Sequence, residues 1–169
     1  TMQIEENLAL AARRGQPRGL KWGITALERA DYRELLKTLD LGLEDRLTAK
    51  VGLLSGGQRQ ALTLLMASLK QPKLLLLDEH TAALDPKTAD KVLALSDQIV
   101  QENNLTTLMI THNMKDAIAH GNRLIMMDAG RVVVDISGED KKKLTVPDLL
   151  ALFSRASGSD EVNDKMLLS

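Results

Sequence analysis

The hydrophobic pattern in the middle of the chain changes from a helical period to a continuous apolar run. After Ser55, which can cap a helix, apolar residues recur every three or four positions and predict a helix buried on one face. These residues are Leu62, Leu65, Met66 and Leu69. Pro72 ends the pattern, and Leu74–Leu77 follows without any alternation. Such a run predicts a strand covered on both faces in a parallel sheet.

Other patterned segments flank this centre. Thr25 followed by Glu28 is a capping-box pair that predicts the start of a helix, and Asp128–Gly130 predicts a hairpin turn. Further helices are predicted over residues 2–14, 25–39, 87–102, 114–120 and 145–155. Further strands are predicted over residues 106–110, 124–127 and 131–136.

This order of elements predicts an α/β protein with a helical front. Residues 1–70 form a predicted helical subdomain, residues 71–156 an α/β core, and residues 157–169 a polar tail. Alternation of strands and helices in the core predicts a parallel sheet with crossover helices. Ligands of such sheets gather at the carboxyl ends of the strands.

Composition excludes several classes of protein. A net charge of -1 argues against a nucleic-acid-binding surface, which is usually basic. Aromatic residues make up only 2% of the chain, too few for a base-stacking platform. No cysteine is present, which excludes disulfides and thiolate metal sites. No apolar stretch has the length of a membrane span.

Two adjacent carboxylates follow the predicted strand Leu74–Leu77. Asp78 at a strand end can hold Mg²⁺, directly or through water, and Mg²⁺ bridges phosphate oxygens. Glu79 comes next and could orient an attacking water. The alternative is that both residues are only the polar exit of a strand.

Other candidate residues give weaker evidence of a functional site when each is taken alone. His112 follows a predicted strand and could donate a hydrogen bond to a phosphate or to water, although a single histidine there is more often structural. Ser55, Gly56 and Gly57 offer a hydroxyl and backbone amides to an anion, although a plain helix cap explains them too. Asp85 precedes a proline and could simply begin a turn. His80 and His120 have no metal-ligand spacing and are predicted to have no role beyond surface or core packing. The three lysines from Lys141 form a predicted solvated run.

Together, the order and spacing of these segments resemble the ATP-binding cassette (ABC) ATPases. Leu54–Gln58 resembles the signature motif, and Leu74–Glu79 resembles the Walker B strand with its catalytic glutamate. Ala83–Asp85 resembles the D-loop, and Thr111 with His112 resembles the switch histidine. The resemblance covers the chain from Gly52 to Arg131, and the helical front is similar to the family's helical subdomain.

The resemblance implies a role for each matched residue. Ser55, Gly56, Gly57 and Gln58 would contact an ATP held by the opposite subunit of a head-to-tail dimer. Asp78 would serve Mg²⁺, Glu79 would polarise water, and His112 would sense the terminal phosphate. Asp85 would communicate across the dimer. The implied cofactors are therefore ATP and Mg²⁺.

The chain departs from the family pattern at one motif. The phosphate-binding loop G-x-x-x-x-G-K-[ST] does not occur, because no glycine is followed by lysine. We therefore expect Thr1 to begin inside a P-loop NTPase-type core that is incomplete, and the 169 residues alone to bind ATP weakly and hydrolyse it poorly.

The resemblance is strongest to bacterial importers. It implies an ATPase subunit at the cytoplasmic face of the membrane, with a second cassette subunit, an integral membrane permease and, in some systems, an extracytoplasmic substrate-binding protein as partners. Two alternatives stay open from the sequence. One is a soluble cassette ATPase of DNA repair or translation, and the other is a non-catalytic cassette fragment. The transported substrate does not follow from the sequence.

Overall fold

The computed structural model describes residues 2–16 and 23–157 of the chain. It contains two compact units, Thr1–Met109 and Ile110–Ser169. These compact units do not test the predicted division into functional subdomains at residues 70 and 156, which stays a prediction. Residues 17–22 of the predicted loop and the tail from residue 158 lie outside the described residues.

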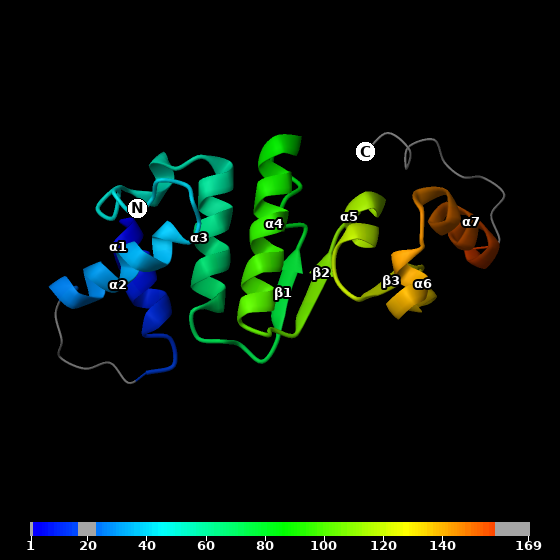
Figure 1. The fold of residues 1–169 in the computed structure, drawn as a ribbon, viewed down its shortest axis with the longest axis horizontal. Coiled ribbons are helices and arrows are strands. Elements are labelled where there is room, and N and C mark those ends of the chain that lie inside the picture. Colours follow the sequence, from blue (N-terminus) through cyan, green and yellow to red (C-terminus); the bar gives the residue numbers. More distant parts are fainter. Residues whose placement is uncertain (1, 17–22, 158–169) are drawn as a thin grey trace. The chain divides into compact units, whose positions relative to one another are not determined.

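The first unit begins with the predicted helices. They are α1 (Ile4–Ala12), α2 (Ala26–Lys37) and α3 (Gly56–Ser68), with a short 3₁₀ turn η1 (Val51–Leu53) before α3 (Figure 1). The predicted capping box of α2 is confirmed, because the Glu28 amide donates to Thr25 Oγ1 at 3.2 Å. The Thr25 amide donates in return to the Glu28 carboxylate at 2.8 Å. This backbone bond, together with Arg13, lowers the pKa of Glu28 to about 2.

A core of leucines joins the three helices. It includes Leu8 from α1, Leu36 from α2 and Leu62 from α3, all fully or almost fully buried. A backbone hydrogen bond fixes the start of α1, since the Ile4 amide donates to the Ala49 carbonyl at 3.0 Å. Burial of Glu5 beside this core is compensated by Arg29, whose Nε donates to the Glu5 carboxylate at 2.7 Å.

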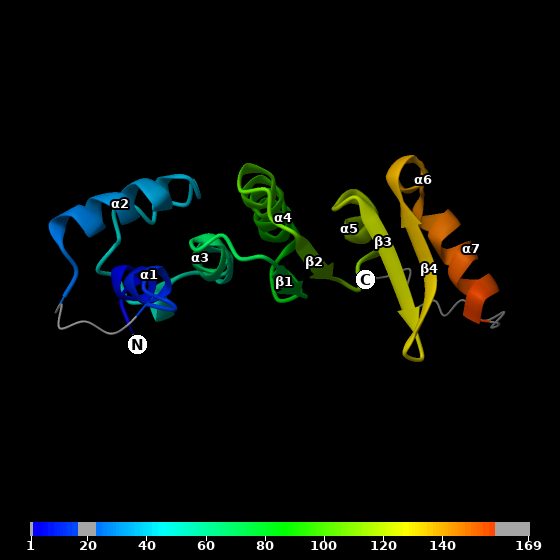
Figure 2. The same ribbon diagram turned by 90° about the horizontal axis from the view of Figure 1, so that it is seen from below.

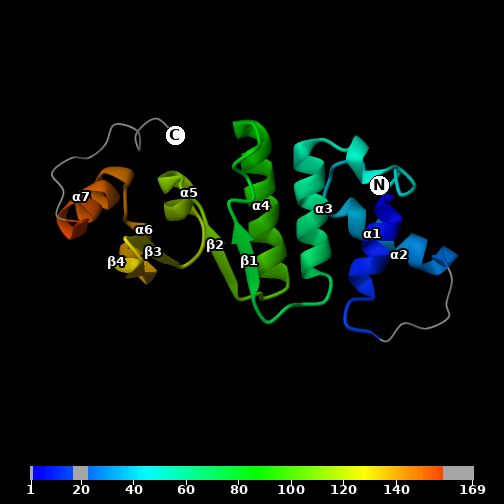
Figure 3. The same ribbon diagram turned by 180° about the vertical axis from the view of Figure 1, so that it is seen from behind.

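The α/β part of the first unit is a small sheet with helices on one side (Figure 3). Strand β1 (Leu75–Asp78) is joined to β2 (Thr107–Ile110) by helix α4 (Pro86–Glu102), and the two strands are neighbours. The amide at the start of β1, that of Leu75, bonds to the Thr106 carbonyl just before β2. Both strands therefore begin at the same end of the sheet, as the predicted parallel crossover requires.

The expectation that the leucine run is covered on both faces is wrong within this unit. Leu75 and Leu77 are buried against α3 and α4, whereas Leu74 and Leu76 are 51% and 63% exposed. The reason is that the sheet has two strands and both helices lie over one of its faces. An uninterrupted apolar run cannot distinguish these cases, because it looks the same whether one face or both are covered.

The second unit is a hairpin packed against helices. Strands β3 (Arg123–Asp128) and β4 (Arg131–Ser137) pair antiparallel around the turn at residues 129 and 130, as predicted. Helix α7 (Val146–Ser157) lies along one face of the hairpin (Figure 2). Helix α5 (Met114–Ala119) was also predicted, whereas the short helix α6 (Gly138–Lys142) was not. The core of this unit is centred on Leu124, Val134 and Leu149.

Lys141 corrects the prediction of a solvated lysine run. Its side chain is buried, and its ammonium group donates to the carbonyls of Ile118 and His120 at the C-terminal end of α5. Burial lowers the pKa of Lys141. A cation at the carboxyl end of a helix satisfies carbonyls that have no partner within the helix. Lys142 and Lys143 are exposed, as predicted.

Candidate functional site

The glycine turn at residues 55–58 opens helix α3 by a reciprocal cap. Ser55 is the N-cap residue, and its hydroxyl accepts from the Gln58 amide at 3.2 Å. In return, the Ser55 amide donates to Gln58 Oε1 at 3.1 Å. The predicted capping role of Ser55 is thus confirmed. Its hydroxyl lies on an exposed residue and is already used within the turn.

Gln58 has a second bond that ties the turn to the helical front. Its Nε2 donates to the Leu41 carbonyl at 3.2 Å, so both polar ends of the side chain have partners. A contact between Gln58 and a nucleotide would have to share or replace one of these bonds. The role of Gln58 in nucleotide binding stays a prediction.

The two glycines of the turn face the start of helix α4. A methyl group at Gly57 would overlap Thr88 Cγ2, and one at Gly56 would lie 3.0 Å from Leu84 Cδ2. Gly57 is buried, whereas Gly56 is partly exposed. At Gly57 the absent side chain therefore serves helix packing within the chain. Close approach to a phosphate, which the sequence suggested for both glycines, stays a prediction.

The acidic pair lies at the end of β1, beside the glycine turn. Asp78 is the last residue of β1 and Glu79 follows it; both are exposed. The segment that continues to α4 brings Leu84 and Thr88 against Gly56 and Gly57. The amino end of α3 and the carboxyl end of β1 thus lie at the same end of the first unit (Figures 1 and 3).

Glu79 has an unusual backbone conformation. Its φ is +43°, in the left-handed region that residues other than glycine seldom adopt. Conformations of this kind cost about 1–3 kcal/mol and persist only where the surroundings hold them. The turn redirects the chain immediately after the strand and presents the Glu79 side chain at the strand end.

His80 contributes a contact that sequence reasoning missed. Its Nε2 lies 3.0 Å from Ser96 Oγ, and Ser96 is a buried residue of α4. The expectation that His80 has no role beyond surface or core packing did not foresee this bond. One signal was available: Ser96 falls on the face of α4 that carries Val92 and Ile99, where a polar side chain needs a partner.

Asp85 caps helix α4. Its Oδ1 accepts from the Thr88 amide at 3.1 Å, and Pro86 occupies the first turn. Hydrogen bonds from Thr88, side chain first and backbone next, lower the pKa of Asp85. The sequence suggested that Asp85 begins a turn, and in the structure Asp85 caps the helix that follows. Communication across a dimer stays a prediction.

His112 belongs to the second unit. It is exposed and lies between β2 and Asn113, which caps α5 by accepting from the amides of Lys115 and Asp116 at 2.9 and 3.3 Å. The Asn113 amide also donates to Thr111 Oγ1 at 3.0 Å. The segment after the strand is therefore held by its own polar groups. Proximity of His112 to the acidic pair stays a prediction.

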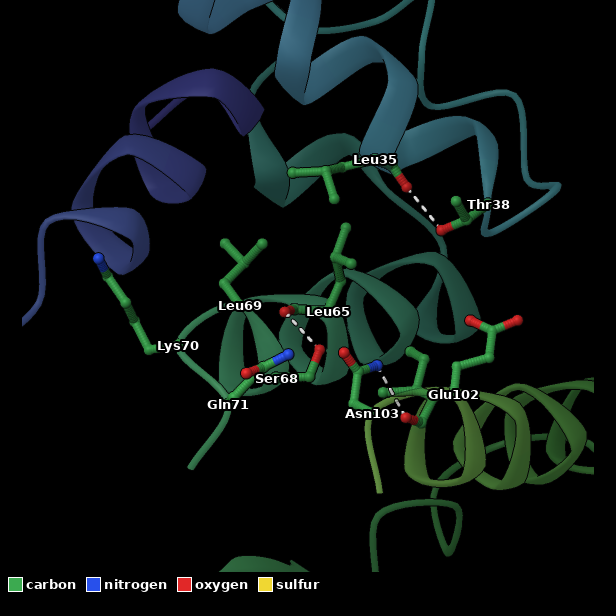
Figure 4. A pocket seen from close by; sticks show the side chains of 10 residues that line it. Leu35, Thr38, Leu65, Ser68, Leu69, Lys70, Gln71, Glu102 and Asn103 are labelled. Carbon is green, nitrogen blue, oxygen red and sulfur yellow. Dashed lines mark hydrogen bonds between the residues drawn. The ribbon is translucent and has the colours of Figure 1, made fainter. Parts of the chain in front are cut away.

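A cleft in the first unit lies away from these residues. It has a volume of about 470 Å³ and is formed by the carboxyl ends of α2, α3 and α4 (Figure 4). Ser68, one of its lining residues, lies at the far end of α3 from Ser55, roughly 20 Å away by the rise of a helix. Ser68 and Asn103 donate to carbonyls of their own helices. The cleft is thus separate from the glycine turn and the acidic pair.

The side chains at the end of β1 limit the kind of metal ion that could bind there. Within residues 2–16 and 23–157, no three acidic or histidine side chains form a metal-binding group. Asp78 and Glu79 supply carboxylates only. This fits Mg²⁺, which is usually held by one or two carboxylates together with water and phosphate oxygens. In the same residues, no helix is both long and apolar enough to cross a membrane.

Comparisons with known proteins agree with this arrangement. A family profile described as ABC transporter matches residues 1–82. The chain is 49% identical over 156 residues to a tyrosine transport ATP-binding protein of Clostridioides difficile, covering 92% of this chain and 62% of the relative. It is 35% identical to the methionine import ATP-binding protein MetN of Streptococcus pneumoniae, covering 96% of this chain and 44% of the relative. The chain therefore spans less than two thirds of these curated relatives.

Solved structures give the same result for the fold. A chain of an ABC transporter in an inward-facing conformation superposes with a TM-score of 0.66 at 29% identity, covering 89% of this chain and 58% of that one. The ATP-binding cassette MJ1267 superposes with a TM-score of 0.68 at 23% identity, covering 90% and 62%. The fold is that of an ABC ATPase cassette. The chain belongs to the ABC transporter ATP-binding family.

Proposed function

We propose that this chain is the part of an ATP-hydrolysing subunit that carries the signature turn and the catalytic carboxylates, and that the complete protein powers solute import. One observation carries the proposal. A glycine turn opening α3 and an acidic pair ending β1 lie at the same end of one compact unit, joined by the contacts of Gly56 and Gly57. The relative named for tyrosine transport supports a role in transport, and the relative named for methionine import supports its direction.

The glycine turn binds the phosphates of an ATP that is held by a second cassette subunit. Backbone amides at the start of α3 point out of the helix and favour an anion, which the helix dipole reinforces. The exposed Ser55 hydroxyl would add a donor. Two such subunits related by a twofold axis would form two equivalent nucleotide sites.

The acidic pair performs the hydrolytic step in this proposal. Asp78 would hold Mg²⁺, which when bound neutralises charge on the phosphate oxygens. Glu79 accepts a hydrogen bond from the attacking water and orients it, and its backbone turn presents the carboxylate at the strand end. His112 donates a hydrogen bond to the terminal phosphate in this scheme. Asp85 relays the state of one site to the other subunit.

The partners follow from import. An integral membrane permease would select the solute, and an extracytoplasmic substrate-binding protein would deliver it. The subunit itself would be peripheral, at the cytoplasmic face of the membrane. A net charge of -1 supports a role that does not involve nucleic acid.

The decisive variant is Glu79→Gln in the complete protein. It keeps the size of the side chain and removes the charge that orients water. We expect ATP turnover to fall by about 100-fold or more. Nucleotide affinity should stay within twofold, and a dimer should accumulate in the presence of ATP. Phosphate release, equilibrium nucleotide binding and size-exclusion chromatography measure these three quantities.

Glu34→Gln is the matched control. Glu34 is an exposed carboxylate of α2 whose contact is a surface ion pair with Lys37. Its replacement should leave turnover unchanged. Normal turnover in Glu79→Gln, or an equal fall in both variants, would remove Glu79 from the catalytic role and the proposed function with it.

A further inference from the structure

The segment between the acidic pair and helix α4 is held at both ends by side chains. At its far end, Asp85 caps α4 through the Thr88 amide. At its near end, His80 reaches Ser96 in the body of α4. Between them, the Ala82 amide donates to the Glu79 carbonyl at 3.0 Å, and the Leu84 amide donates to the Thr81 carbonyl at 3.0 Å. The chain that leaves β1 is thus a sequence of tight turns anchored on α4.

The His80 bond has a defined direction. Ser96 Oγ donates its single proton to the Val92 carbonyl at 2.8 Å. The hydroxyl oxygen is then an acceptor toward His80, so His80 Nε2 must carry the hydrogen that it donates at 3.0 Å. Ser96 is only 4% exposed and is fixed by its own helix. The histidine therefore binds to a rigid point.

The residue next to His80 combines an exposed side chain with a sparsely populated backbone conformation. Glu79 is exposed, so it lacks the apolar packing that fixes a core side chain, and its φ of +43° lies in a sparsely populated region. A backbone of this kind keeps its direction only if neighbouring contacts hold it. The bond from the adjacent side chain to a buried serine supplies such a contact.

We propose that His80 is a positioning residue: by bonding to Ser96 it holds the turn that aims the Glu79 carboxylate at the attacking water. This inference rests on the proposed function and names a further residue for the same reaction. His80 is not a catalytic residue in this account, since it acts through Glu79. Its loss should affect the chemical step more than nucleotide binding.

The first test is a kinetic comparison in the complete protein. His80→Ala and Ser96→Ala each remove one partner of the bond and should each lower kcat by about 10-fold or more, because small displacements of a catalytic group are costly. The KM for ATP should stay within twofold. The double variant should be no worse than either single variant, since both remove the same bond. An unchanged kcat, or a fall that matches a rise in KM, overturns the proposal.

Two further variants separate positioning from folding. His80→Gln keeps a donor nitrogen at a similar reach and should restore most of kcat; a kcat as low as that of His80→Ala overturns the proposal. Ser68→Ala is the matched control, because Ser68 is also a buried helix serine that donates to its own helix but has no histidine partner. It should keep full kcat, whereas a fall equal to that of Ser96→Ala would mark a general packing effect and overturn the proposal.

A spectroscopic readout tests the bond without relying on activity. In protein labelled with ¹⁵N-histidine, the His80 ring should show a hydrogen on Nε2, and Ser96→Ala should shift its resonances. A hydrogen on Nδ1 alone overturns the assignment. Glu79→Gln distinguishes the two proposals: if it stalls turnover while His80→Ala does not, the positioning role fails alone; if it leaves turnover intact, the proposed function fails.

Discussion

The glycine turn that opens α3 is closed by its own side chains, whereas the acidic pair at the end of β1 is exposed and includes a residue with a strained backbone. Ser55 and Gln58 bond to each other, and Gly57 is packed against Thr88. Glu79 has a left-handed backbone and an exposed carboxylate. One region is built for a fixed shape, and the other keeps a reactive group accessible. Substitutions that disturb the contacts of the glycine turn should therefore lower stability, while a substitution that removes the Glu79 charge and keeps its backbone conformation should lower activity alone.

The largest effect on stability is expected from Gly57→Ala. The new methyl group would overlap Thr88 Cγ2, so we expect the free energy of unfolding to fall by about 1–3 kcal/mol. In an open helical position the same change would be stabilising, because alanine favours helices over glycine by about 0.5–1 kcal/mol. Urea denaturation followed by circular dichroism measures the difference.

Two comparisons show whether the overlap is the cause. A methyl group at Gly52 would meet nothing within 4 Å, so Gly52→Ala should leave stability nearly unchanged. Adding Thr88→Ser to Gly57→Ala removes the Cγ2 atom and should recover most of the loss. Equal stability of Gly57→Ala and the original protein would show that the turn is not fixed by this packing.

The next effect concerns the cap of α3. Ser55→Ala removes the acceptor for the Gln58 amide and should lower the free energy of unfolding by about 1 kcal/mol. Ser55→Gly should lower the free energy of unfolding by only about a few tenths of a kcal/mol, since glycine is tolerated at this position. Thermal denaturation of both variants gives the stability difference.

The same pair separates capping from nucleotide binding. Both variants lack the hydroxyl, so a contact between Ser55 and the nucleotide predicts the same loss of ATPase activity in each. An activity loss that follows stability, large for alanine and small for glycine, would limit Ser55 to its structural role.

At the acidic end, Glu79→Gly is expected to stabilise the protein while it abolishes hydrolysis. Glycine adopts a φ of +43° without steric cost, so the free energy of unfolding should rise by up to about 1 kcal/mol. Glu79→Gln is the control, because it keeps the strain and removes only the charge. A glycine variant less stable than the glutamine variant would contradict the view that this turn is held under strain.

The smallest effect is a pH dependence at Asp85. Its pKa is lowered from the ordinary 3.8 by hydrogen bonds from Thr88, so the ionised form stabilises the folded state. That contribution is fully present above pH 3.8 and is lost as the pH falls through the lowered pKa. Asp85→Asn keeps a capping oxygen without the charge, and its stability should approach that of the original protein over this range. A difference that grows on acidification would contradict the assignment.

The positions of most elements were predictable because local signals set them. The capping pairs at Thr25 and Ser55 and the turn at Asp128–Gly130 all lie where short-range chemistry predicts. The exposed face of β1, the short helix α6 and the buried Lys141 were not predicted. Each depends on what covers a segment, and that comes from residues distant in the sequence.

The family, the order of helices and strands, and the spacing between the glycine turn and the acidic pair can be read from the residues alone, because they follow from local periodicity and motif spacing. Three contacts emerge only in the folded chain: Gly57 fits against Thr88, Gln58 bonds to Leu41, and His80 is anchored on Ser96. Each of these contacts joins segments that are separated along the chain and that meet only when the helices, the loop before α3 and the turn after β1 pack together. Local sequence patterns do not show which distant segments will pack against one another, because that depends on how the whole chain buries its apolar residues.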